Sequence, residues 1–206
     1  MNKIENGANL DALQYNEGHR EKVNGICLSL FKSFAITYFA YLRLYPSGRL
    51  LRLCTHTPWS REYFEQEFYN DTEFYDYHFK RTPKGRGQAF LWIAQKETNL
   101  YSSLQKNNIW NGLSIYKRSG SYMESCSFGT IPENRALNST FINKKQVFYD
   151  FLDHFKYQAD ELIHPLETAA FIQSGLEICD ETQTNSKNVE TFLDAIGSSR
   201  TRLRKV

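Results

Sequence analysis

The stretch from Ile36 to Thr55 constrains the fold most, because it predicts two strands joined by a tight turn. Side chains alternate along its first half with the period of two that is typical of a β-strand. Pro46-Ser47-Gly48 predicts the turn, since Pro presets φ and Gly accepts a positive φ. Both faces of the first strand are rich in apolar and aromatic residues, so we expect both to be covered. One face carries Ile36, Tyr38, Ala40, Leu42 and Leu44, and the other carries Thr37, Phe39, Tyr41, Arg43 and Tyr45.

Other segments of the chain predict helices and strands that could surround this hairpin. Apolar residues have helical spacing at 20–34, from Thr57 to about Asn70, at 98–110 and at 144–163. Short strands are predicted at 89–93, 113–117 and 122–128, and Asn111-Gly112 is expected to end the helix that precedes the second of them. Residues 166–179 have further helical character, whereas 131–143 has the composition of a loop.

The order of these elements predicts an α/β (α+β) fold in which an antiparallel five-stranded sheet is sandwiched by helices. This is the architecture of PAS/GAF-like sensor domains. Residues 1–19 are polar and lack periodicity, so we expect them to form a mobile arm or a loosely docked turn. Residues 20–166 would form the sensing domain, and 167–206 a helical extension, a polar linker and a basic tail.

The composition argues against several classes of function. A net charge of +2 is too small to favour nucleic-acid binding over the whole surface. The four cysteines lie far apart without a C-x-x-C spacing, and no apolar run serves as a leader or reaches the ~18 residues of a membrane span. We therefore expect a reduced, cytoplasmic protein. The aromatic fraction of 15% is high, which either a large core or a ligand cage would explain.

No pattern of catalytic or metal-binding residues stands out. The five histidines have no metal-like spacing to cysteine or to each other. Asp153-His154 and Cys54-Thr55-His56 could form catalytic pairs, but no nucleophile elbow, phosphate-binding loop or pair of carboxylates accompanies them. The sequence therefore predicts neither an enzyme nor a cofactor.

Three runs of sequence together resemble one family. They are NGICLSLFKSFAITYFAYLRLYPSGRLLRLCTHTPWSREY, FLWIAQ and IWNGLSIYKRSGSYMESCSFGT. The pattern resembles the N-terminal autoinducer-binding domain of LuxR-type transcription regulators, which act in quorum sensing. More closely, it resembles the LuxR-like orphan sensors of intracellular gammaproteobacteria, and the resemblance extends over roughly residues 20–166.

The resemblance implies a set of ligand-binding residues. In the family a Trp, a Tyr four residues later and an Asp on the next segment hold the head group of an acyl-homoserine lactone. Here these roles would fall to Trp59, Tyr63 and Asp71, although the acid of the family is followed by Pro and Asp71 is followed by Thr. A second Trp and a Gly, which shape the pocket in the family, match Trp92 and Gly112.

The residues themselves leave open whether these aromatic side chains bind a ligand or fill a core. A small amphiphile needs an apolar slot and a few fixed polar groups, and Trp and Tyr supply both. Phe39, Tyr41 and Arg43 either line such a pocket or face a covering helix. Ser125 and Ser127 lie on the small face of the predicted strand 122–128, which would leave space for a cavity.

Two functional hypotheses follow from the sequence. In the first, a small amphiphilic ligand enters a cavity at the sheet, orders the helix of Trp59 and changes dimerisation or docking to a partner. In the second, the domain has lost ligand recognition and forms homodimers, or heterodimers with a full-length regulator, through an apolar patch on 144–163 or on the first helix. LuxR-type regulators carry a helix-turn-helix after the sensor, and we expect none before Val206, hence no direct nucleic-acid binding.

Overall fold

The predicted hairpin forms two inner strands of the sheet, β1 (Tyr38–Leu44) and β2 (Arg49–Cys54). The computed structural model describes residues 3–71, 75, 77–78, 81–85, 87–94 and 98–176. The other strands are β3 (Gly87–Leu91), β4 (Trp110–Arg118), β5 (Met123–Thr130) and β6 (Ile172–Gln173). Their order is β3-β4-β5-β1-β2-β6, and each neighbouring pair is antiparallel. The predicted antiparallel sheet is confirmed, with six strands in place of five.

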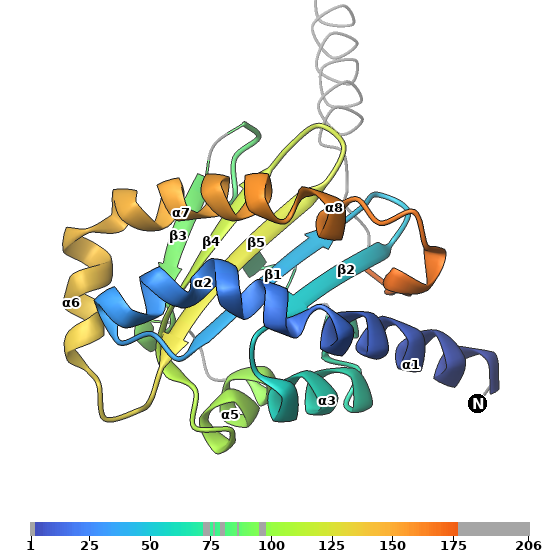
Figure 1. Ribbon diagram of the computed structural model, residues 1–206, viewed down its shortest axis with the longest axis horizontal. Coiled ribbons are helices and arrows are strands. Elements are labelled where there is room, and N and C mark those ends of the chain that lie inside the picture. Colours follow the sequence, from blue (N-terminus) through green and yellow to red (C-terminus); the bar gives the residue numbers. More distant parts are fainter. Residues whose placement is uncertain are drawn as a thin grey trace, which may run out of the picture.

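Helices cover both faces of the sheet. Helices α2 (Arg20–Phe34), α6 (Ala136–Asn143), α7 (Lys145–Gln158) and α8 (Asp160–Ile163) pack on the face that carries Phe39 and Tyr41. Helices α3 (Thr57–Glu65) and α5 (Asn99–Lys106) pack on the face that carries Tyr38 and Leu42. Figure 1 shows α2 and α7 running across the near face of the sheet. Every residue of β1 is consequently buried, as its two apolar faces predict.

Helix α1 (Lys3–Gly18) stands where the sequence predicts a polar arm. The helix is held by tertiary contacts and not by a broad apolar stripe. Ala12 and Asn16 are buried, and the Tyr15 hydroxyl donates to the backbone oxygen of Leu162 at 3.0 Å. Asn16 accepts from the backbone N–H of Cys54 at 2.6 Å and donates to the Ser60 hydroxyl at 3.1 Å. Such bonds leave no periodic signal, which is why the prediction was wrong.

Helix α6 occupies part of the predicted loop 131–143, which is a second correction. Only two apolar side chains of this segment, Leu137 and Phe141, reach the core, and they are four residues apart on one helix face. Asn138 of the same helix is buried and donates to the side-chain oxygen of Asn111 at 3.0 Å. Asparagine favours turns when it stands alone, so its abundance here concealed the helix.

Several boundaries also differ from those predicted. Helix α3 ends at Glu65 and is followed by a 3₁₀ turn, η1 (Phe68–Asn70). Helix α5 ends at Lys106, so that Gly112 belongs to β4 and does not end a helix. Residues 166–176 contain a 3₁₀ turn, η3 (Thr168–Ala170), and β6 in place of the predicted helix. The predicted polar linker and basic tail lie outside the described residues. Within the described ranges, no helix is long and apolar enough to cross a membrane.

The position of α1 predicts that Asn16→Ala destabilises the fold. The substitution leaves the buried N–H of Cys54 without its acceptor, and unfolding free energy should fall by about 1 to 3 kcal/mol in urea titrations. Gln14→Ala is the matched control, because Gln14 is exposed on the same helix, and it should change stability by less than about 0.5 kcal/mol. Equal, small effects of both substitutions would mean that α1 does not dock through Asn16.

Candidate ligand-binding cavity

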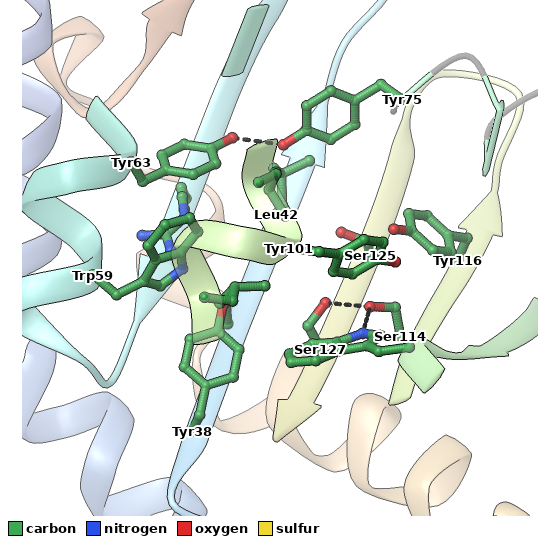
Figure 2. Close-up of a pocket in the computed structure, with 15 residues that line it drawn as sticks. Tyr38, Leu42, Trp59, Tyr63, Tyr75, Tyr101, Ser114, Tyr116, Ser125 and Ser127 are labelled. Carbon is green, nitrogen blue, oxygen red and sulfur yellow. Dashed lines mark hydrogen bonds between the residues drawn. The ribbon is translucent and has the colours of Figure 1, made fainter. Parts of the chain in front are cut away.

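A cavity of about 50 Å³ lies between the sheet and helices α3 and α5. Polar and aromatic side chains dominate its lining. Figure 2 shows Trp59 and Tyr63 of α3 on one side of the cavity and the serines of the sheet on the other. The tyrosines are Tyr38, Tyr63, Tyr75, Tyr101 and Tyr116, the tryptophans Trp59 and Trp92, and the serines Ser114, Ser125 and Ser127. Arg52 and the apolar residues Ala40, Leu42, Leu100 and Leu104 complete the described lining.

Small side chains at the centre of the sheet leave the space for this cavity. Ser114 of β4 lies opposite Ser127 of β5, and Ser127 lies opposite Ala40 of β1. Ser125 lies opposite Leu42 in the same register. The hydroxyls of Ser114 and Ser127 are 2.7 Å apart (Figure 2). Ser125 and Ser127 thus stand in the cavity wall, while their contact with a ligand stays a prediction.

Trp92 closes one part of the wall because Gly112 leaves room for its ring. The indole N–H donates to the Ser114 hydroxyl at 2.9 Å. A Cβ atom at Gly112 would lie only 2.3 Å from the indole ring, far inside van der Waals contact. The absence of a side chain at Gly112 in β4 therefore lets the Trp92 ring pack against the strand in the cavity wall.

Helix α3 presents Trp59 and Tyr63 to the cavity from positions four residues apart. His56 caps the helix, since its Nδ1 accepts from the backbone N–H of Trp59 at 3.2 Å. Burial, with the charge of Arg52 added, lowers the pKa of His56 and favours the neutral ring that can accept this bond. The Tyr63 and Tyr75 hydroxyls are 2.6 Å apart (Figure 2), and burial raises the pKa of Tyr63 to about 12.

Arg52 is the charged residue of the described lining, and sequence reasoning missed it. It lies on β2, and its Nη1 donates to the Ser60 hydroxyl at 2.9 Å. The guanidinium carbon lies 4.2 Å from the centroid of the Tyr63 ring. Alternation along β2 could have found it, because Leu51 and Leu53 both face the opposite core.

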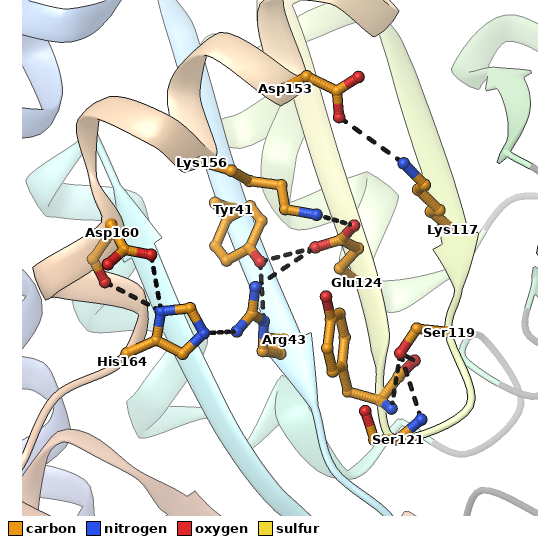
Figure 3. A network of polar contacts seen from close by, with 11 residues as sticks. Tyr41, Arg43, Lys117, Ser119, Ser121, Glu124, Asp153, Lys156, Asp160 and His164 are labelled. Carbon is orange, nitrogen blue, oxygen red and sulfur yellow. Dashed lines mark hydrogen bonds and ion pairs between the residues drawn. The ribbon is translucent and has the colours of Figure 1, made fainter.

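Phe39, Tyr41 and Arg43 were predicted as pocket residues, and the structure places them on the other face of the sheet. Phe39 packs on Phe155 of α7 with ring centroids 4.7 Å apart. Arg43 and Tyr41 belong to a buried polar network around Glu124, which is shown in Figure 3. The prediction was wrong in its choice of face. The register with β5 sets Arg43 opposite Glu124, away from the serines.

Asp71 also stands outside the described lining of the cavity. It follows η1 and is half-buried, and its backbone oxygen accepts from the N–H of Tyr75 at 3.1 Å. Tyr75 supplies the polar group beside Tyr63 instead. Of the residues matched to the family pattern, the structure therefore brings Trp59, Tyr63 and Trp92 together around one cavity, with Gly112 behind Trp92.

Other members of the lining were not predicted. Tyr38 was expected on the face opposite the pocket, and Ser114 and Tyr116 alternate with the core residues Leu113 and Ile115 along β4. That alternation is visible in the sequence, whereas the approach of Tyr101 depends on how α5 packs. Among the described residues, no three His, Cys, Asp or Glu side chains gather in a way that could hold a metal ion.

No protein-family model matches the chain, and no curated protein matches it by sequence. One solved structure that is similar is the N-acylhomoserine lactone dependent LuxR family transcription factor CepR2 from Burkholderia cenocepacia. The sequence identity is 12% and the TM-score 0.48, and the match covers 76% of this chain and 92% of that chain. Similarity of this degree does not identify a ligand for this chain.

The contact between Trp92 and Gly112 predicts that Gly112→Ala disturbs the cavity wall. The added methyl group would overlap the indole, so the unfolding free energy should fall by about 1 to 3 kcal/mol and tryptophan fluorescence should shift. Gly25→Ala is the control, since a Cβ there meets nothing within 4 Å and α2 should gain up to about 1 kcal/mol. A neutral Gly112→Ala variant would contradict this packing.

His78 predicts a pH dependence of stability. It stacks on Tyr116 with ring centroids 4.6 Å apart, and burial together with the charge of Arg81 lowers its pKa from 6.5 to about 4. Between these values the unfolded chain binds a proton that the folded chain excludes, so stability is lost as the pH falls through this window. The part due to His78 is at most about 3 kcal/mol. Urea unfolding at pH 7 and pH 4.5 should show a smaller loss for His78→Phe, and equal losses would contradict the assignment.

Proposed function

We propose that this chain is a small-molecule sensing domain of the LuxR type, which takes an amphiphilic ligand into the cavity between the sheet and helices α3 and α5. The observation that carries the proposal is the lining of that cavity. Three serines, five tyrosines and one arginine turn toward a space in the interior of the protein. An ordinary core would be filled with closely packed apolar side chains. Burying a polar group costs stability unless that group forms a hydrogen bond.

The chemistry of the lining suits an amphiphile. Leu42, Leu100 and Leu104 offer an apolar surface for a carbon chain. The hydroxyls of Ser125 and Tyr63 and the guanidinium of Arg52 offer polar contacts for a head group. A few placed polar groups in a mostly apolar and aromatic site are the usual means by which proteins orient small ligands.

The volume of the cavity implies that the wall moves when a ligand enters. Ligand pockets usually measure about 300 to 1,000 Å³, and this cavity is about 50 Å³. Tyr63 of α3 and Tyr75 lie side by side in the wall, where their hydroxyls are 2.6 Å apart. We propose that a ligand separates these two side chains and stabilises the expanded cavity, and that a ligand with higher affinity stabilises it more.

The proposal includes the setting in which sensing takes place. Residues 20–166 would form the sensing unit, in the cytoplasm, as part of transcription regulation by quorum sensing. Contact with a second copy or with a full-length regulator would pass the signal on. The chain is proposed to act without a cofactor and without catalysis.

A partner-binding role is the second candidate, and the surface of α2 and α7 favours it. A hollow of about 340 Å³ between these helices is lined by Leu30, Phe34, Val147 and Phe151, among others. Val147 of α7, which lines this hollow, is 39% exposed. Exposed apolar side chains beside a hollow are typical of contact surfaces between proteins.

Thermal melting with a panel of acyl-homoserine lactones and fatty-acid-like compounds tests the proposed function. At least one compound should raise the melting temperature of the wild type, because a ligand that binds only the folded state stabilises it. Ser125→Leu fills the cavity and should abolish the rise, whereas Ser125→Ala keeps the space and should retain it. The same ligand response in Ser125→Leu would contradict the site. A flat melting temperature throughout, with dimerisation in size-exclusion chromatography, would favour the second candidate.

A further inference from the structure

We infer that the ligand of this cavity carries an anionic oxygen group, such as a carboxylate, that pairs with the guanidinium of Arg52. The inference rests on the proposed function, since it specifies the chemistry of the ligand for the same cavity. Arg52 is only 4% exposed and lies in β2, opposite Leu42 in the middle of the sheet. A guanidinium keeps its proton in proteins, so a full positive charge lies in the cavity wall.

The contacts of Arg52 leave part of this charge without a partner. Nη1 donates to the Ser60 hydroxyl, and the Tyr63 ring lies 4.2 Å from the guanidinium carbon. Nη2 is buried and has no hydrogen-bond acceptor among the described residues. Because Arg52 lines the cavity, a ligand bound there would supply the acceptor that this buried nitrogen lacks.

The described part of the chain also supplies no counter-charge. No carboxylate there lies within 4.0 Å of Arg52. Burial raises the pKa values of Tyr38, Tyr63 and Tyr75, so these phenols are neutral near pH 7. Asp71, which matches the acid of the family pattern, is not among the residues that line the cavity.

Arg43 shows how the same sheet treats a buried arginine that has a structural role. Its Nη2 lies 3.6 Å from the carboxylate of Glu124, and both side chains are 2% exposed. Its Nε donates to the Tyr41 hydroxyl and its Nη1 to Nε2 of His164, both at 2.9 Å (Figure 3). Each nitrogen of Arg43 therefore faces a partner, and one of these partners is a buried carboxylate. In contrast, Arg52 has a nitrogen without an acceptor and no carboxylate partner among the described residues.

A carboxylate would complete the surroundings of Arg52. Its oxygens accept strong, charge-assisted hydrogen bonds from guanidinium nitrogens, and pairing removes the cost of an isolated buried charge. A short carbon chain attached to it would contact Leu42, Leu100 and Leu104, which line the same space. The alternative is that Arg52 only ties β2 to α3 through Ser60, in which case the charge of the ligand would not matter.

Hexanoate and hexanamide separate these cases, because they share size and chain length and differ in charge. Binding to the full chain at pH 7.5 can be followed by the fluorescence of Trp59 and Trp92, which line the cavity, and by melting temperature. We expect the wild type to bind hexanoate at least tenfold more tightly than hexanamide. Arg52→Gln should reduce this preference to less than twofold, and Arg52→Lys should retain part of it. Arg49→Gln is the matched control on the same strand, since Arg49 is exposed and stacks on Phe171, and it should keep the full preference.

The outcomes distinguish this inference from the function on which it rests. Equal affinity of the wild type for the two compounds, abolished by Ser125→Leu, would overturn the inference and leave the sensing cavity in place. A preference that Arg52→Gln does not change would overturn it as well. Binding of neither compound, together with a flat response to the wider panel, would overturn both. The wild-type ratio decides the first case even where an Arg52 variant fails to fold.

Discussion

The pairing of β1 with β5 determines which side of the sheet is filled and which is hollow. The register places Phe39 beside Phe128 and Arg43 beside Glu124, so the large and charged side chains share the face under α7. The other face then receives Ala40 and Leu42 beside Ser127 and Ser125. A shift by one residue would reverse both faces and bury the serines under α7. The cavity is thus a consequence of strand register, and the helices around it only close it.

The two faces show two ways of burying charge. Beneath α7, the Glu124 carboxylate accepts hydrogen bonds from the Tyr41 hydroxyl at 2.8 Å and from Nζ of Lys156 at 2.7 Å (Figure 3). It also forms an ion pair with Arg43. This network is closed, which suits a permanent support between the sheet and the last helices. Around the cavity the hydroxyls of Tyr63 and Tyr75 bond to each other, while Arg52 keeps a nitrogen available. We infer from this difference that the first network supports the fold and that the second surrounds a ligand.

Much of the fold could be predicted from local pattern. The periods of α2, β1, β2 and β5 are strong, and the small face of Ser125 and Ser127 correctly indicated space beside the sheet. Local sequence pattern does not reveal how strands pair, and the pairing decides which face of β1 and β2 meets the cavity. Arg43 was therefore assigned to the cavity and Arg52 was overlooked. Helix α1 depends on single polar anchors such as Asn16, and β6 on two residues, and neither leaves a periodic signal. Tyr75 and Tyr101 enter the lining through tertiary packing of segments that the sequence does not place.

Ser60 connects the cavity wall to helix α1. Its hydroxyl accepts from Nη1 of Arg52 and from the side-chain amide of Asn16, so β2, α3 and α1 meet at one oxygen. Asn16 in turn holds the backbone of Cys54, two residues from Arg52. A ligand that draws the guanidinium toward the cavity would weaken its bond to Ser60 and alter the support of α1. Because α1 also contacts α8 through Tyr15 and Leu162, the charge at Arg52 and the helices on the far face of the sheet are parts of one connected arrangement.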